Sequence, residues 1–255
     1  MKKPLIEFEN VHKGFDGLAV RKGIDLLIVG GQVTTIIGKS GSGKSVLLKH
    51  IIGLLEPDQG SILWAGRPLK AHNRAERRQL KLKCSYMFQG NALFDSLTVF
   101  DNIALPLRER DRLGPEPIRQ RVRDMVAQLD ISGIEEKFPS QLSGGMRKRV
   151  AMARALITQP EIILFDEPTT GLDPIRRNAA HQMIVNHQRR FGFTGVMVSH
   201  EIPDVFYISQ RIAMLDEGRI VFQGSCSEIH QSDHPTVRAF LASPPSDHVC
   251  SGPAT

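Results

Sequence analysis

Residues 38–45, with the sequence GKSGSGKS, combine residue types that can bind a phosphate group. Glycines let successive backbone N–H groups turn around phosphate oxygens without steric conflict from a Cβ atom. Lys44 has the length to reach the β- and γ-phosphates of a nucleotide, and the hydroxyl of Ser45 is suited to ligate Mg²⁺. The stretch therefore predicts nucleotide binding, and a glycine-rich turn without a ligand is the alternative.

The segments on both sides of this loop support the prediction. The apolar run Val33–Ile37 predicts a strand before it, and residues 46–55 predict a helix after it. The N-terminus of such a helix directs unpaired amides and positive partial charge towards a bound anion. The residues expected to contact the nucleotide are Gly38, Lys39, Ser40, Gly41, Ser42, Gly43, Lys44, Ser45 and Val46.

Two adjacent carboxylates, Asp166 and Glu167, follow the apolar run at residues 162–165. A fully apolar run is typical of a strand buried on both faces of a parallel sheet, and open α/β sheets bind ligands at the carboxyl ends of such strands. We expect Asp166 to hold Mg²⁺ through its water shell and Glu167 to accept a proton from the water that attacks the γ-phosphate. A solvent-facing carboxylate pair is the alternative, which the phosphate-binding loop argues against.

A second glycine-rich segment, LSGGM at residues 142–146, precedes a helix expected over residues 147–156. Ser143 lies near the N-cap position, and with Gly144 and Gly145 it forms a second candidate anion site. Each phosphate-binding loop binds one nucleotide, so this second site has no ligand within its own chain. A head-to-tail, two-fold dimer would close it on the γ-phosphate of the partner. On its own, the segment is more often a simple loop and helix cap.

The composition is that of an ordinary soluble globular protein, with 41% hydrophobic and 24% charged residues among 255. The net charge of +6 comes from 33 basic and 27 acidic residues. Solvated helix faces are the favoured explanation, with attraction of nucleotide or an anionic membrane surface as the alternative. Three cysteines are too few and too irregular for a disulfide framework or a zinc site. The start of the chain lacks the pattern of a signal peptide, and no apolar run reaches the roughly 18 residues of a membrane span, so a cytosolic chain is expected.

The pattern along the chain changes from strands to helices after Gln89. The clearest helical face consists of Ile118, Val122, Met125, Val126 and Leu129. Alternating strands and helices then resume, with a helix expected over residues 175–190 and a strand over 195–199. A hairpin turn is expected at 216–218, short helices near Ser225 and Pro235, and disorder over the Pro- and Ser-rich residues 243–255.

Together these motifs resemble those of the ATP-binding cassette (ABC) family, and the resemblance covers residues 5–241. Walker A is residues 38–45, the signature is 142–146, and Walker B is 162–166 with Glu167 as the catalytic carboxylate. The resemblance implies an α/β P-loop NTPase core with an antiparallel β subdomain and an inserted helical subdomain. The implied organisation is one domain over residues 1–242, with the core at 1–89 and 146–242, the helical subdomain with the signature at 90–145, and a tail at 243–255.

The resemblance also assigns roles to four residues outside those motifs. Gln89 would contact Mg²⁺ or the attacking water and sense the helical subdomain, and His200 would contact the γ-phosphate. Asp173 belongs to the D-loop, and Phe15 occupies the place of an adenine-stacking aromatic. The alternatives are an ordinary polar strand end for Gln89, a structural histidine for His200 and a plain core position for Phe15. Lys44 completes the expected catalytic set, and ATP and Mg²⁺ are the expected substrate and cofactor.

Several segments narrow the resemblance to the ATPase subunits of Mla-type lipid transporters. They are residues 85–94, 97–103, 143–146 and 173–175, although Met146 replaces the usual Gln at the end of the signature. The resemblance implies a homodimer on the cytoplasmic face of the inner membrane, a membrane permease, an MCE-domain lipid-binding protein and a small STAS-domain subunit, and no nucleic-acid partner. Whether the short tail takes part in the dimer is open. The permease is expected to cover the apolar residues Leu93, Phe94, Leu97, Val99 and Phe100, or else some of these pack inside the helical subdomain.

Three other functions stay open on the sequence. An ABC ATPase subunit that powers transport of another solute has the same motifs. A soluble cassette that acts on nucleic acid or ribosomes usually carries two cassettes or a long coiled-coil insertion, which this chain lacks. An interaction module with a dead site is opposed by the presence of Lys44, Asp166, Glu167 and His200.

Overall fold

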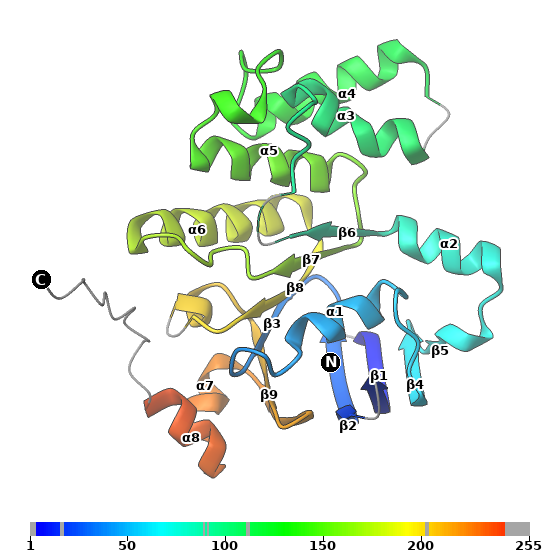
Figure 1. Cartoon of the computed structure of the whole chain (residues 1–255), viewed down its shortest axis with the longest axis vertical. Helices are drawn as coiled ribbons and strands as arrows, with labels where there is room; N and C mark the ends of the chain where they lie inside the picture. Colours follow the sequence, from blue (N-terminus) through cyan, green and yellow to red (C-terminus); the bar gives the residue numbers. More distant parts are fainter. Residues whose placement is uncertain are drawn as a thin grey trace, which may run out of the picture.

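The computed structural model describes residues 4–15, 18–88, 90, 92–110, 113–201 and 204–242 (Figure 1). In this part of the chain, the larger of two β-sheets carries the phosphate-binding loop. Its six strands, in spatial order, are β10 (Arg219–Gly224), β9 (Arg211–Asp216), β3 (Val33–Ile37), β8 (Thr194–Ser199), β7 (Ile162–Asp166) and β6 (Cys84–Met87). All neighbouring pairs are parallel except the β9–β10 hairpin. Every residue of β3 and β8 is buried, as expected for strands covered on both faces. The carboxyl ends of β3, β7 and β8 therefore meet at one edge of the sheet.

The second sheet is antiparallel and has four strands in the order β2 (Leu18–Val29), β1 (Pro4–Phe15), β4 (Gln59–Trp64) and β5 (Arg67–Pro68). Its apolar residues share one core with one face of the large sheet and with the helix that follows the phosphate-binding loop, including Phe8, Leu47, Leu48, Ile162 and Val196. β1 extends to Phe15, beyond the strand pattern of residues 5–11, because pairing with β2 continues through several register shifts. The predicted turn at residues 15–17 lies partly outside the described residues.

The α-helices are α1 (Lys44–Ile51), α2 (Arg74–Leu82), α3 (Val99–Arg110), α4 (Pro115–Gln128), α5 (Gly144–Leu156), α6 (Pro174–Phe191), α7 (Cys226–His230) and α8 (Pro235–Ala242). Short 3₁₀ turns occupy Leu69–Ala71, Pro139–Gln141 and Asp204–Tyr207. The predicted helix at 46–55 is wrong at its end, since α1 stops at Ile51. Gly53 has a φ of 65°, and the amides of Gly53 and Leu54 donate to the carbonyls of His50 and Lys49 at 3.0 and 2.9 Å. This Schellman-type closure ends the helix because glycine adopts the left-handed conformation at little cost.

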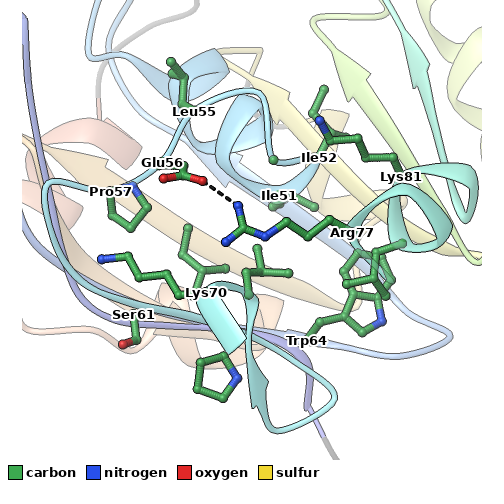
Figure 2. Close-up of a pocket in the computed structure, with 15 residues that line it drawn as sticks. Ile51, Ile52, Leu55, Glu56, Pro57, Ser61, Trp64, Lys70, Arg77 and Lys81 are labelled. Atoms are coloured by element: carbon green, nitrogen blue, oxygen red, sulfur yellow. Dashed lines mark hydrogen bonds and ion pairs between the residues drawn. The ribbon is translucent and has the colours of Figure 1, made fainter. Parts of the chain in front are cut away.

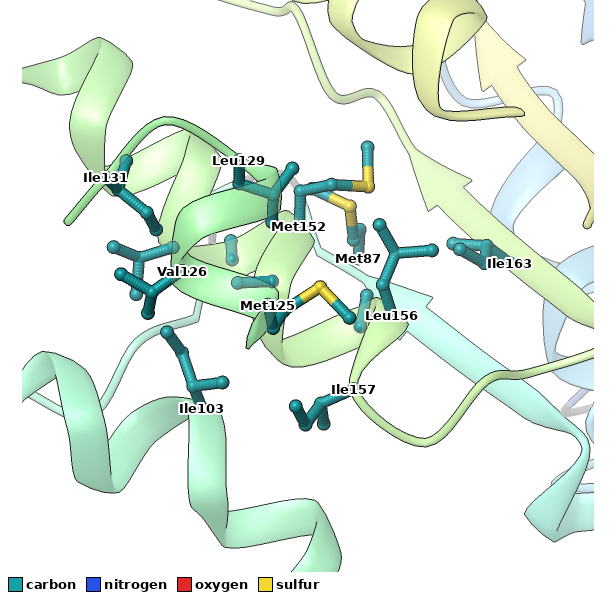
Figure 3. Packing of buried hydrophobic residues seen from close by; sticks show 14 of the residues in the cluster. Met87, Ile103, Met125, Val126, Leu129, Ile131, Met152, Leu156, Ile157 and Ile163 are labelled. Carbon is teal, nitrogen blue, oxygen red and sulfur yellow. The ribbon is translucent and has the colours of Figure 1, made fainter. Parts of the chain in front are cut away.

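Helices α5 and α6 lie on the face of the large sheet opposite α1, and α3 and α4 pack on α5 beyond them (Figure 1). Figure 3 shows how the apolar face predicted in residues 118–129 packs, with Met125 and Val126 of α4 beside Met152 and Leu156 of α5. The same cluster continues to Ile163 on the sheet, so one core joins the helical layer to β7. The predicted boundary at residue 146 falls inside α5, and the division into subdomains stays a prediction.

Candidate nucleotide-binding site

The phosphate-binding loop has a backbone conformation that only its glycines permit. Gly38, Gly41 and Gly43 have φ angles of 154°, 75° and 85°. A Cβ atom on Gly38 would lie 2.3 Å from the carbonyl oxygen of Leu215, so a side chain at this position would displace β9. Positive φ values let consecutive amides point into one concavity, the geometry that binds an anion. The loop backbone thus has the conformation expected of a phosphate-binding loop, and phosphate binding stays a prediction.

Lys44, the first residue of α1, is folded back against the loop. Its side chain is 4% exposed, and Nζ donates to the carbonyl oxygens of Gly38 and Lys39 at 2.9 and 3.0 Å. Burial lowers the pKa of Lys44, an effect that the nearby carboxylates of Glu167 and Asp166 oppose. These loop contacts use two of the three ammonium donors. The loop thus positions Lys44, and an anionic phosphate nearby would stabilise its charged ammonium form.

Asp166 accepts a hydrogen bond on each carboxylate oxygen. The Ser45 hydroxyl donates to Oδ1 and the Tyr86 hydroxyl donates to Oδ2, both at 2.7 Å. A carboxylate and a hydroxyl are hard oxygen ligands, and Mg²⁺ is commonly bound by one or two carboxylates together with substrate phosphates. Within the described residues no group of three or more His, Cys, Asp or Glu could hold a metal ion without other ligands. The pair of Ser45 and Asp166 fits a Mg²⁺ ion that nucleotide phosphates complete.

Tyr86 is a site residue that sequence reasoning missed. It stands on β6, which pairs in parallel with β7 so that Tyr86 is opposite Leu164. Burial and the adjacent Asp166 carboxylate, to which it donates, raise the pKa of Tyr86, so the phenol stays a neutral donor. Its ring lies 4.3 Å, centroid to centroid, from that of the exposed Phe88. No local motif marks Tyr86, because its role depends on the pairing of two strands.

Glu167 and His200 come together at the carboxyl ends of β7 and β8. His200 Nδ1 lies 3.3 Å from Glu167 Oε1, and the Thr170 hydroxyl donates to Glu167 Oε2 at 3.1 Å. Glu167 has a φ of 48°, and its amide donates to the carbonyl oxygen of Val198 at 3.1 Å, which anchors the bend after the strand. The side chains of Glu167 and His200 are 20% and 34% exposed, so both are reachable by a water molecule. This arrangement suits a general base with a neighbouring polar partner.

Sequence reasoning also missed a charged network that holds the loops after these two catalytic candidates. The Thr169 hydroxyl donates to Glu201 Oε2, and Arg177 Nε lies 3.5 Å from Glu201 Oε1. Lys148 of α5 donates to the carbonyl oxygen of Pro168. Burial lowers the pKa of Lys148, an effect that Glu201 opposes. The network ties the helix after the signature to the residues next to the candidate base.

The signature segment lies on the other side of the large sheet from α1. Ser143 is the N-cap of α5, and its hydroxyl accepts a hydrogen bond from the amide of Met146 at 3.3 Å. Cβ atoms added to Gly144 and Gly145 would meet nothing within 4 Å. Since α5 packs on the face opposite α1, the fold separates Ser143 from the phosphate-binding loop of its own chain (Figure 1).

The three remaining candidates are less closely tied to the site. Asp173 is the N-cap of α6, with Oδ1 accepting from the amide of Arg176 at 3.0 Å. Phe15 is 40% exposed, and Lys13 Nζ lies 5.7 Å from its ring centroid. Gln89 lies outside the described residues. Stacking of Phe15 on adenine and the roles of Asp173 and Gln89 stay predictions.

The glycine loop, Lys44 and the carboxylates at one edge of a mostly parallel sheet define the chain as a P-loop nucleotide-binding protein. Comparison with known families narrows that class: the model of the ABC transporter family matches residues 21–170. The chain belongs to the ABC transporter family, and the fold expected from its motifs, with an added antiparallel sheet, is confirmed.

Curated relatives agree with the family assignment. Over 92% of this chain and 66% of the relative, it is 38% identical to the probable ribonucleotide transport ATP-binding protein mkl of Mycobacterium tuberculosis. The chain thus spans just under two thirds of the length of that mycobacterial protein. It is 37% identical to the intermembrane phospholipid transport system ATP-binding protein MlaF of Escherichia coli K12, over 90% of this chain and 84% of MlaF.

Solved structures agree as well. One is cbiO1 of Clostridium perfringens, part of the ABC transporter complex cbiONQ, with a TM-score of 0.83, 29% identity, and coverage of 91% of this chain and 92% of that one. Another is the ATP-binding cassette MJ0796, a dimer in a post-hydrolysis state bound to ADP and Pi, with a TM-score of 0.74, 30% identity, and coverage of 87% and 98%. In the part of the chain that the structure describes, no helix is both long enough and apolar enough to cross a membrane.

Proposed function

We propose that this chain is the ATP-hydrolysing, energy-coupling subunit of an ABC transporter that moves phospholipid between the inner and outer membranes. The observation that carries the ATPase proposal is the meeting of Lys44, Ser45, Asp166, Glu167 and His200 at one edge of the large sheet. In this proposal Mg²⁺, when bound, supplies charge that stabilises the phosphates, and Ser45 and Asp166 hold it.

Each side chain then has one part in the reaction. Lys44 binds β- and γ-phosphate oxygens of ATP, the substrate, and the loop amides orient them. Glu167 Oε1 accepts a proton from the attacking water. His200, whose Nδ1 lies 3.3 Å away, keeps that carboxylate in position and contacts the γ-phosphate. Tyr86 holds Asp166 through the 2.7 Å hydrogen bond to Oδ2. Closure of the site excludes bulk water and retains the attacking water molecule. ATP favours closure because it binds the closed form better than the open form.

The phospholipid substrate is supported by the similarity to MlaF, whose name describes intermembrane phospholipid transport. A second candidate, transport of another solute, is supported by 38% identity to the methionine import ATP-binding protein MetN of Cereibacter sphaeroides and by the mycobacterial relative named for ribonucleotide transport. Sequence identity alone does not separate these substrates. The substrate therefore needs a direct test. For the phospholipid transporter we propose a permease, an MCE-domain protein and a STAS-domain subunit as partners.

A surface groove beside the helical layer is the proposed contact for the permease. It has a volume of about 290 Å³ and is lined by residues of β6, α3 and α5 and by the exposed Leu54. Phe94 is 52% exposed near this groove, with the guanidinium carbon of Arg154, a lining residue, 5.9 Å from its ring centroid. Val99 follows the alternative stated for these apolar residues, because it is fully buried in the core of the helical layer.

The test starts from membranes of cells that express the tagged chain. Gentle solubilisation, purification and mass spectrometry should recover a permease, an MCE-domain protein and phospholipid. Phe94→Asp should retain nucleotide binding and lose permease recovery and permease-stimulated hydrolysis, because it places a charge on an apolar contact. Phe138→Asp is the matched control, since Phe138 is also exposed, at 42%. Recovery of another solute with the permease would favour the second candidate, and recovery of ribosomes or nucleic acid without a permease would contradict transport.

We further propose a homodimer in which Ser143 of one copy completes the phosphate site of the other. The placement of α5 and α1 on opposite faces of the sheet and the dimer of MJ0796 support this arrangement. Mixed dimers of a Ser143→Arg chain with a Lys44→Ala chain, both carrying Glu167→Gln, should occlude one ATP, because both lesions fall in one composite site. If the signature acts within its own chain, each site carries one lesion and none is occluded.

A further inference from the structure

A cavity of about 220 Å³ lies under α2, away from the nucleotide site. Its floor is apolar and comes from three elements, with Ile51 and Ile52 at the end of α1, Ile62 and Trp64 on β4, and Leu80 on α2. Ile51, Ile62 and Trp64 are buried, at 2%, 3% and 5% exposure. The cavity therefore offers an apolar surface of the kind that binds apolar groups.

Polar contacts hold the first half of α2, and its partly buried Leu80 packs against the apolar core. Every residue of α2 is at least partly exposed. Asn73 and Glu76 form a capping box at its start, and Arg67 Nη1 contacts Glu76 Oε1 at 2.9 Å. Arg77 Nη1 contacts Glu56 Oε1 at 2.6 Å, so this ion pair spans the mouth of the cavity (Figure 2). A helix held in this way leaves the space beneath it unfilled.

The rim of the cavity is cationic. Lys70 and Lys81 stand on opposite sides of Arg77 (Figure 2), and the carboxylate of Glu56 is the acidic group among the lining residues. Three cations against one anion leave a net charge of +2 at the mouth. Outside the cavity, Arg74 and Arg78 add further positive charge on α2. The rim thus complements an anionic group held above an apolar floor.

We infer that this cavity binds an anionic amphiphile with a single apolar tail of medium length, the tail under α2 and the anionic head between Lys70 and Lys81. An apolar protein cavity of about 150 Å³ binds benzene, which has six carbons. In proportion, the 220 Å³ under α2 has room for roughly nine carbons. That size matches one short acyl chain and is too small for a helix of a partner protein, which is about 10 Å wide.

The sole tryptophan of the chain makes the inference directly measurable, because Trp64 lines the cavity. Decanoate has nine tail carbons and a carboxylate, and it is titrated into the purified full-length chain below its micellar concentration. We expect a saturable blue shift of the Trp64 emission. Decylammonium, with the same total of ten carbons and opposite charge, should give no saturable shift, and decanol should bind about tenfold more weakly than decanoate. Inorganic phosphate alone should give no shift.

Variants separate the rim from the rest of α2. Lys70→Gln and Lys81→Gln should each weaken decanoate binding about fivefold, as expected for exposed charge pairs, with an unchanged melting temperature. Arg78→Gln is the matched control, because it removes the same charge from α2 without lining the cavity, and its affinity should equal that of the wild type. Leu80→Phe adds bulk to the wall and should weaken decanoate and decanol alike.

Three outcomes would overturn the inference. The first is equal affinity for decanoate and decylammonium, which removes the role of the cations. The second is an equal loss of affinity in Arg78→Gln and Lys81→Gln, which indicates general attraction to α2. The third is a Trp64 response to vesicles containing phosphatidylglycerol but not to dissolved decanoate, which indicates contact with a membrane surface and not a ligand in the cavity.

Discussion

Replacing Tyr86 by Phe removes one oxygen atom from the proposed Mg²⁺ site and leaves the ring. That oxygen donates to Asp166 Oδ2 at 2.7 Å, while Ser45 donates to Oδ1 at the same distance. A hydrogen bond to a charged group contributes about 1.5–3 kcal/mol. Loss of an outer partner of a metal ligand lowers metal affinity about 10- to 100-fold, which corresponds to about 1.4–2.8 kcal/mol. The two ranges agree, so Tyr86→Phe should weaken Mg²⁺ binding by at least about tenfold.

The assay is a Mg²⁺ titration at fixed ATP that follows both binding of a fluorescent ATP analogue and phosphate release. The Mg²⁺ concentration at half-saturation should rise about tenfold or more, while turnover at saturating Mg²⁺ stays within about threefold of wild type, because Tyr86 positions Asp166 and not the base. Ser85→Ala is the matched control: it removes a hydroxyl from the neighbouring residue, which donates to the carbonyl oxygen of Ala155 at 2.8 Å. A Tyr86→Phe chain that folds normally and has the same Mg²⁺ half-saturation as Ser85→Ala would refute the positioning role.

Four further predictions test the site and the fold. Lys44→Ala should abolish ATP binding measured by titration, whereas Glu167→Gln should retain it and lose about 10²- to 10⁴-fold in phosphate release, and a wild-type rate would exclude Glu167 as the base. Lys148→Met should lower turnover about tenfold with little change in ATP affinity, because its hydrogen bond holds the residue after Glu167, and a matching loss of affinity would contradict this. Asn102→Ala should lower the free energy of unfolding by about 2–4 kcal/mol in urea, since this fully buried side chain makes four hydrogen bonds to nearby backbone groups. Burial lowers the pKa of His187 from 6.5 to about 4. The unfolded chain therefore binds the proton first, and the stability of the folded chain falls as pH drops from 6.5 towards 4. His187→Leu should reduce the loss of melting temperature between about pH 7 and pH 5, and an unchanged loss would exclude this residue as the cause.

Several elements could be predicted because their causes are local in the chain. The strand Val33–Ile37 follows from its apolar run, and α6 at Pro174–Phe191 matches the helix expected at residues 175–190. Ser143 was expected near an N-cap and is the N-cap of α5. The hairpin turn also formed as predicted, with Glu217 and Gly218 at φ angles of 43° and 80° between β9 and β10. Capping, turn chemistry and apolar periodicity act over a few residues, so their signals are visible in the sequence.

The end of α1 was predicted wrongly and the burial of Val99 was left open, for related reasons. The apolar residues beyond Ile51 favour a longer helix in the sequence pattern. The helix ends earlier because Gly53 forms the closing turn. Val99 is one of several neighbouring apolar residues that could contact a partner or pack inside the helical subdomain, and it begins α3 and packs against the other helices. Apolar composition indicates that a residue can be buried, but the neighbours that bury it come from other segments.

The candidate site residues could be predicted from the sequence: a glycine loop with Lys44 and Ser45, and carboxylates at the end of an apolar strand. The partners of those residues are visible only in the folded chain, since the Tyr86 hydroxyl donates to Asp166 across 80 positions of the sequence. The tertiary structure also decided that α2 rests on ion pairs above a cavity with a tryptophan in its wall. Strand pairing and helix placement minimise the free energy of the whole chain, so contacts between distant segments leave no local pattern to find.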